Sequence, residues 1–202
     1  MNDDKRMMNT YEIKYAIHIG DKEVVFGVDE SNADTPYVVS YCSWDNPLSM
    51  DQYFNAVGDS DYMELMDEFT SRVTAQIQAV KAERDKVAVP LKPFTVDQCF
   101  PNHYGNSIEN QVVALRPERL RPEYRTGNNQ LVLATGGFGT HANSRGRAVY
   151  TVNLYSGKES RWNCEDILGV VKPECIPDWA RERLEQVRQQ RQENQKKQEQ
   201  ER

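Results

Sequence analysis

Apolar and polar side chains alternate along residues 11–19. The apolar positions in this stretch are Tyr11, Ile13, Tyr15, Ile17 and Ile19. A period of two is typical of a strand with one buried face. Gly20-Asp21 suits a tight turn, and residues 22–28 and 37–42 predict two more strands. Three strands with one apolar face need a covering element.

A helical period follows these strands. Between residues 61 and 86, apolar side chains recur every three or four positions, at Tyr62, Met66, Phe69, Val73, Ile77 and Val80. This spacing places them on one face of a helix, and Asp61 with Glu64 has the spacing of a capping box. We therefore expect a long helix that covers the sheet. Ser49 and Gln52 share the capping-box spacing and predict a short helix opening at Met50.

The second half of the chain has mostly strand patterns. Pro90, Pro93 and Pro101 favour a connector over residues 87–101. Short strands are then predicted at 111–115, 130–135, 148–155, 160–163 and 168–172. Pro177-Asp178-Trp179 predicts the start of a helix, whose short apolar stripe ends at Val187. The polar tail beyond Val187 is either a solvated helix extension or disordered.

These patterns predict an α+β fold. Its first part is a small antiparallel sheet covered by a long helix. A β-rich half follows, either barrel-like or a curled sheet, and then a polar helical tail. The corresponding division of the chain is 1–90, 91–176 and 177–202.

Charge is distributed unevenly along the 202 residues, whose net charge is −6. Residues 1–111 carry 9 Lys and Arg against 19 Asp and Glu, and residues 112–202 carry 16 against 12. The halves either attract each other, or the basic half meets an anionic partner. We expect no N-terminal signal peptide, because residues 1–10 are polar. The sequence has no apolar run of about 20 residues and no CxxC pair among its four cysteines. We expect a cytoplasmic protein with free thiols, no membrane contact and no cofactor.

The basic residues gather between positions 112 and 161. The arginines there are Arg116, Arg119, Arg121, Arg125, Arg145, Arg147 and Arg161, with Tyr124, Phe138, Tyr150 and Trp162 among them. Basic residues interleaved with aromatic rings are suited to single-stranded nucleic acid. The pI of about 5.2 and the lack of a known nucleic-acid motif count against this reading. The alternative is that the rings are in the core and the arginines pair with Glu118 and Glu123.

A glycine-rich segment at 136–146 is the most unusual part of the sequence. Gly136, Gly137 and Gly139 permit close backbone approach, and Arg145 and Arg147 follow them. Exposed amides with two arginines are suited to an anion, and thus to an enzyme with an anionic substrate. The segment lacks a Walker A ending and no helix follows it. The alternative is that the glycines serve turns.

Cysteine and histidine form no convincing catalytic or metal pattern. Cys99 and His103 are four residues apart, and a nucleophile pair there lacks a local signature. Cys99, His103, Cys164 and Cys175 could together be zinc ligands, but they lack the paired spacing that zinc sites have. We assign no catalytic and no metal-binding residue.

Several short motifs resemble an uncharacterised family of small accessory proteins, carried on conjugative or integrative elements of anaerobic gut bacteria. They lie at 17–27, 43–48, 120–125, 130–139, 143–146 and 166–169. The resemblance implies a bacterial, cytoplasmic protein with an accessory role on a mobile element, and it assigns no residue a role. With no catalytic signature, we expect a non-catalytic binding protein whose partner is a protein. Nucleic-acid binding and an enzyme at 136–146 are the alternatives.

Overall fold

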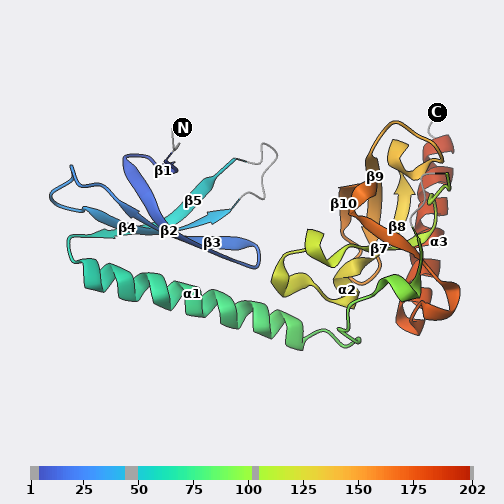
Figure 1. Ribbon diagram of the computed structural model, residues 1–202, viewed down its shortest axis with the longest axis horizontal. Helices are drawn as coiled ribbons and strands as arrows, with labels where there is room; N and C mark the ends of the chain where they lie inside the picture. Colours follow the sequence, from blue (N-terminus) through green and yellow to red (C-terminus); the bar gives the residue numbers. More distant parts are fainter. Residues whose placement is uncertain (1–4, 44–49, 102–104, 201–202) are drawn as a thin grey trace. The chain divides into compact units, whose positions relative to one another are not determined.

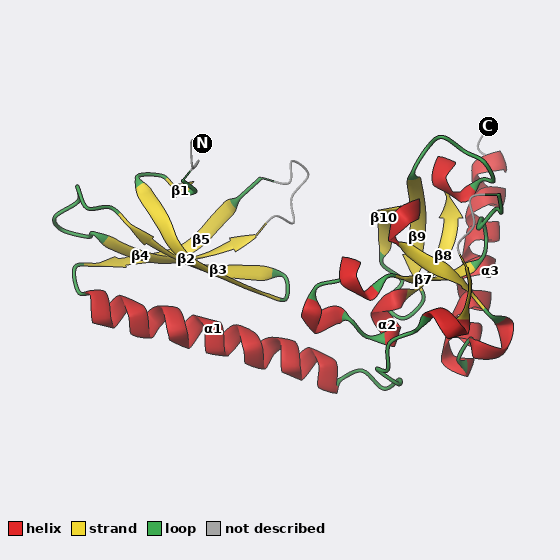
Figure 2. Ribbon diagram, viewed as in Figure 1, coloured by secondary structure: helices red, strands yellow, loops and turns green. Residues whose placement is uncertain are grey.

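The computed structural model describes residues 5–43, 50–101 and 105–200. The chain divides into two compact units, Met1–Lys86 and Val87–Arg202. Each unit contains one antiparallel sheet and one long helix (Figures 1 and 2). The fold class is therefore α+β, as predicted.

The first unit is a five-stranded meander followed by a helix. Its elements are β1 Met7–Met8, β2 Tyr11–Ile19, β3 Lys22–Val28, β4 Tyr37–Ser43, β5 Gln52–Asp59 and α1 Tyr62–Asp85. Neighbouring strands pair in chain order. In Figure 1, α1 runs along one face of the sheet, and β1 and β5 rise on the opposite side.

Residues 52–59 form a strand, so the predicted short helix at Met50 is wrong. Tyr53 and Phe54 pair with Cys42 and Tyr41 of β4. The helix prediction rested on a capping-box spacing of only four residues. Aromatic and β-branched side chains favour a strand where a neighbouring strand, here β4, can pair with them. The other half of that box, Ser49, lies outside the described residues.

The long helix α1 begins where the sequence predicts. Asp61 is its N-cap, and the Asp61 carboxylate accepts hydrogen bonds from the N–H groups of Met63 and Glu64. The core below it contains Val24, Phe26, Val39, Leu65 and Phe69. The opposite face of the curled sheet is buried at Met8, Val25, Val38 and Cys42.

The face of α1 that is buried differs from the predicted stripe. The buried residues are Leu65, Phe69, Arg72, Gln76 and Val80. The amide of Gln76 donates to the carbonyl of Ile19 at 3.1 Å, and Nη1 of Arg72 donates to the carbonyl of Asn55 at 2.7 Å. Tyr62 and Ile77, which belong to the predicted stripe, are exposed. The apolar stripe of α1 thus extends beyond the face that the sheet covers.

The second unit is a six-stranded sheet in the order β10-β9-β8-β7-β11-β6. Its strands are β6 Cys99–Pro101, β7 Val112–Leu115, β8 Leu131–Gly136, β9 Ala148–Asn153, β10 Glu159–Asn163 and β11 Ile167–Val171. Five of the six were predicted. The sixth, β6, lies in the proline-rich connector and pairs with the distant β11.

Helix α3, Asp178–Gln200, packs on one face of this second sheet. Its predicted stripe is confirmed, because Ala180, Leu184 and Val187 are buried in the core with Leu133 and Leu154. A second core on the other face contains Val113, Leu115, Val132 and Ile167. The short helix α2, Gly127–Gln130, leads into β8. Short 3-10 turns lie at Val96–Gln98, Pro117–Arg119, Pro122–Tyr124, Phe138–Thr140, Cys164–Asp166 and Pro173–Cys175.

Candidate functional site

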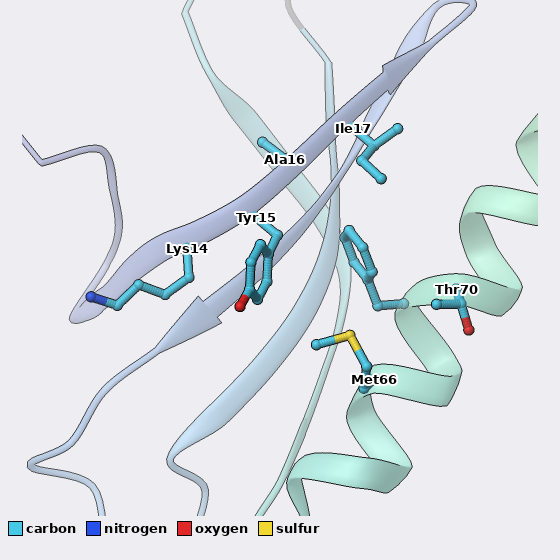
Figure 3. A pocket seen from close by; sticks show the side chains of 7 residues that line it. Lys14, Tyr15, Ala16, Ile17, Met66 and Thr70 are labelled. Carbon is cyan, nitrogen blue, oxygen red and sulfur yellow. The ribbon is translucent and has the colours of Figure 1, made fainter.

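An apolar groove of about 410 Å³ lies between β2 and α1 in the first unit. It is lined by Lys14, Tyr15, Ala16, Ile17, Met66, Phe69 and Thr70. Figure 3 shows Tyr15 and Ile17 projecting from β2 and Met66 reaching from α1 toward Tyr15. Tyr15 and Ile17 are 50% and 40% exposed, which is high for apolar side chains beside a core. The groove therefore presents apolar surface that the unit itself does not cover.

The row of α1 side chains beside the groove contains several apolar residues as well as Thr70. Residues three or four apart on a helix share a row, so Val73 and Ile77 continue the row of Met66 and Thr70. Met63, at the start of the helix, is also exposed. Met66 and Val73 are partly buried against the core of the sheet, so the exposed apolar surface of this row is at Met63 and Ile77.

The edge of β2 beside the groove has free backbone groups. Strand β1 pairs only with Tyr11 and Glu12, and the carbonyl of Arg6 accepts from the N–H of Ile13. Beyond Ile13, no strand in the described part of the chain pairs with β2 on the side away from β3. Alternate N–H and C=O groups along residues 14–17 therefore face outward, as they do at any sheet edge.

The outer edge of β5, at the other side of the sheet, is irregular. Asn55 has a positive φ of 53°, and the β4–β5 register shifts between Val39 and Tyr41. The carbonyl of Asn55 accepts from Arg72 of α1. A bulge of this kind twists an edge away from further pairing. Strand β2 has a register shift of its own between Ile13 and Tyr15, but from Tyr15 to Ile19 it pairs with β3 without interruption. Of the two edges, β2 is therefore better suited to receive another strand.

A charged network spans the other face of the first sheet. Arg6 Nη1 lies 2.6 Å from Glu23 Oε2, Arg6 Nε lies 3.0 Å from Asp51, and Arg6 Nη2 lies 3.4 Å from Cys42 Sγ. Tyr53 donates to Asp51 at 3.0 Å. Burial and the Asp51 carboxylate raise the pKa of Tyr53 to about 12 and also raise the pKa of the Cys42 thiol. A protonated, buried thiol is a weak nucleophile, so this network is structural.

The predicted arginine cluster lies in the second unit, and most of its members have partners. Arg116 donates to the carbonyl of Glu165 at 2.9 Å, Arg119 pairs with Asp166 at 3.0 Å, and Arg147 with Glu165 at 3.2 Å. The Nε of Arg125 donates to the carbonyl of Leu120 at 3.1 Å. Arg121 precedes the 3-10 turn Pro122–Tyr124. Three of the arginines thus gather around the turn Cys164–Asp166, whose two carboxylates were not predicted as partners. Of the pairings with Glu118 and Glu123 that the sequence offered, Arg116 with Glu118 is present at 3.8 Å.

The glycines of 136–146 pack closely on the start of β9. A Cβ on Gly137 would lie 2.4 Å from the carbonyl oxygen of Ala148, and one on Gly139 would lie 2.3 Å from that of Arg147. The N–H of Thr140 donates to the carbonyl of Gly137, and that of His141 to Phe138. Gly136 has a φ of 153° and open space around it. These contacts give Gly137 and Gly139 a packing role, which counts against an open anion site.

Neither the cysteine–histidine pair nor a metal centre gains support from the geometry. Burial and the neighbouring Cys175 raise the pKa of Cys99 to about 11, so its thiolate is scarce near neutral pH. His103 lies outside the described residues. Among the described side chains, no three of His, Cys, Asp and Glu converge on a metal position.

Comparisons with protein-family models, curated proteins and solved structures found no match. The mobile-element resemblance accordingly stays a prediction. No helix of the described chain combines the length and the apolar run needed to cross a membrane. The groove between β2 and α1 is the candidate site that combines exposed apolar side chains with a strand edge. The sequence signal for it was the width of the α1 stripe.

Proposed function

We propose that this chain is a non-catalytic binding protein and that its partner adds a β-strand alongside β2. The observation that carries the proposal is the strand edge at residues 14–17 beside the groove, which no described strand pairs on the side away from β3. Main-chain hydrogen bonds to such an edge supply affinity, and pockets for alternate side chains supply specificity. The occupant is therefore an extended segment of another protein, with apolar residues at alternate positions.

The groove fits this occupant geometrically. A sixth strand hydrogen-bonded to β2 would lie beneath the overhanging row of α1. Its apolar side chains would then contact Met66 and Ile77 from below while flanking Tyr15 and Ile17. Burial of apolar surface stabilises association by about 25 cal/mol per Å² before the costs of ordering. An added strand thus covers both unpaired backbone and exposed apolar side chains.

Charge favours a basic partner over a second copy of this chain. The first unit, residues 1–86, carries 17 Asp and Glu against 8 Lys and Arg. Two such units joined edge to edge would repel each other, whereas a strand with Lys or Arg at its outward positions would be attracted. The partner is therefore a basic, alternating segment. We expect it to act in the bacterial cytoplasm, where the four free thiols stay reduced, in the accessory role that the motifs imply.

The test is selection of 12-residue peptides from a displayed random library on the full chain. Selected peptides should alternate apolar and polar residues, be rich in Lys and Arg, and slow amide exchange at residues 14–17. Ile17→Lys should weaken their binding at least tenfold. The matched control is Val57→Lys, which places the same charge on an exposed residue at the opposite edge and should leave binding unchanged.

Two outcomes would overturn this proposal. One is a set of selected peptides that bind the Ile17→Lys variant as well as the original chain. The other is a dimer in size-exclusion chromatography that Ile17→Lys converts to a monomer, because a second copy would then occupy the edge.

A further inference from the structure

The second unit carries two exposed aromatic rings on one surface. Phe138 is 74% exposed and Tyr150 is 53% exposed. Both border the glycine-rich segment: a Cβ on Gly146 would lie 2.3 Å from Cβ of Phe138, and one on Gly137 would lie 3.2 Å from Cδ2 of Tyr150. The close packing of these glycines therefore holds both rings at the start of β9, where neither is used in the core.

Two uncommitted arginines accompany these rings. Arg161 of β10 pairs in register with Tyr150 of β9, so the two side chains are neighbours on the same face. Arg145 precedes Gly146, the residue that packs against Phe138. Unlike Arg116, Arg119 and Arg147, neither Arg145 nor Arg161 has an ion-pair partner within the described residues. Their charges are thus available to an external anion.

A third cation lies at the rim of this surface. Arg191 of α3 donates to the carbonyl of Thr135 at 3.0 Å, and the hydroxyl of Thr135 donates to the carbonyl of Tyr150 at 3.1 Å. Residues 112–161 as a whole carry 8 Lys and Arg against 3 Asp and Glu. Of these, Arg145 and Arg161 lie beside the exposed rings, so with Arg191 they supply the positive charge of this surface.

We propose that the second unit binds single-stranded nucleic acid on the surface formed by Phe138, Tyr150, Arg145 and Arg161, called here the aromatic–arginine surface. Exposed rings stack on unpaired bases, and arginines hold the phosphates between them. Paired bases of a duplex offer no such stacking face, so single strands bind in preference. This site lies in a different unit from the groove of β2 and is independent of the function proposed above.

The test is fluorescence anisotropy of the full chain with a labelled 12-nucleotide oligothymidine, alone and as a duplex with oligoadenosine, at 20 and 150 mM salt. We expect the single strand to bind at least tenfold more tightly than the duplex. Phe138→Ala with Tyr150→Ala should weaken single-strand binding at least tenfold. Arg145→Ala with Arg161→Ala should reduce the slope of log affinity against log salt by about 1.4, since each phosphate contact on a single strand contributes about 0.7.

The matched control is Arg116→Ala with Arg119→Ala, which also removes two charges but from arginines already paired with Glu118 and Asp166. It should leave the salt slope unchanged. Circular dichroism and thermal unfolding establish that each variant is folded. The proposal is overturned by no binding at 20 mM salt, by equal binding of the duplex, or by a folded Phe138→Ala/Tyr150→Ala variant that binds as tightly as the original chain.

Discussion

The side-chain amide of Gln130 bonds to both backbone groups of Phe94. Its Oε1 accepts from the N–H of Phe94 at 2.7 Å, and its Nε2 donates to the carbonyls of Phe94 at 3.4 Å and Leu115 at 2.9 Å. Gln130 is fully buried at the end of α2. One glutamine thus attaches the connector to the sheet of the second unit.

Gln130→Leu should destabilise the second unit by about 3 kcal/mol, because it leaves three buried backbone groups without partners. Chemical denaturation followed by circular dichroism measures this loss. Gln98→Leu is the control, since the Gln98 side chain accepts from Thr95 in an exposed turn and its loss should cost well under 1 kcal/mol. Equal effects of the two substitutions would contradict the role of Gln130.

Local signals predicted most elements of this chain but not the residues that connect distant segments. Tyr11–Ile19 and the Asp61 cap follow from patterns within a few residues. Strands β5 and β6 form because they pair with strands elsewhere in the chain. The local signals there, a capping-box spacing and a run of prolines, predicted a helix and a connector instead. Arg72 and Gln76 are buried because their long side chains reach backbone carbonyls, which hydropathy does not register. The carboxylates of Glu165 and Asp166 were not predicted as partners of the arginines because these contacts join residues that are distant in the sequence.

Arg6→Met should destabilise the first unit by about 2–3 kcal/mol. It leaves the buried Glu23 carboxylate without its cation, and the loss is smaller than for a fully buried pair because Arg6 is partly exposed. Denaturant unfolding measures it, and adding Glu23→Gln should restore part of the stability. Lys5→Met, which removes an exposed pair with Glu12, should change little. An Arg6→Met variant as stable as the original chain would show that the network contributes nothing.

Gly139→Ala should destabilise the second unit by about 2 kcal/mol, because its Cβ meets the backbone of Arg147 and neither can move without shifting β9. Gly136→Ala meets open space and carries only the strain of its positive φ. Its effect should therefore be smaller in the same thermal unfolding measurement. The reverse order would mean that the glycine-rich segment is not packed as described.

The phenol of Tyr53 gives the first unit a dependence on alkaline pH. Its folded pKa, about 12, lies above the ordinary value of 10.0. A group whose pKa is raised on folding stabilises the fold fully below its unfolded pKa, and this contribution is lost as pH rises through the folded value. Stability should therefore fall between pH 10 and 12. Tyr53→Phe should flatten that decline in denaturant titrations at each pH, and an unchanged profile would contradict the shift.

Each unit also contains one sealed thiol, Cys42 in the first and Cys99 in the second, while Cys164 and Cys175 are only partly buried. Because a reagent reaches exposed thiols more easily, alkylation at pH 8 should label the partly buried Cys164 and Cys175 before Cys42 and Cys99. Labelling of the sealed pair then requires local opening. Peptide mass spectrometry over time would give an opening rate for each unit from one native sample. Different labelling rates of Cys42 and Cys99 would mean that the two units open independently. Identical rates at every denaturant concentration would mean that they open together. The two buried thiols thus report the opening rate of each unit without any added label.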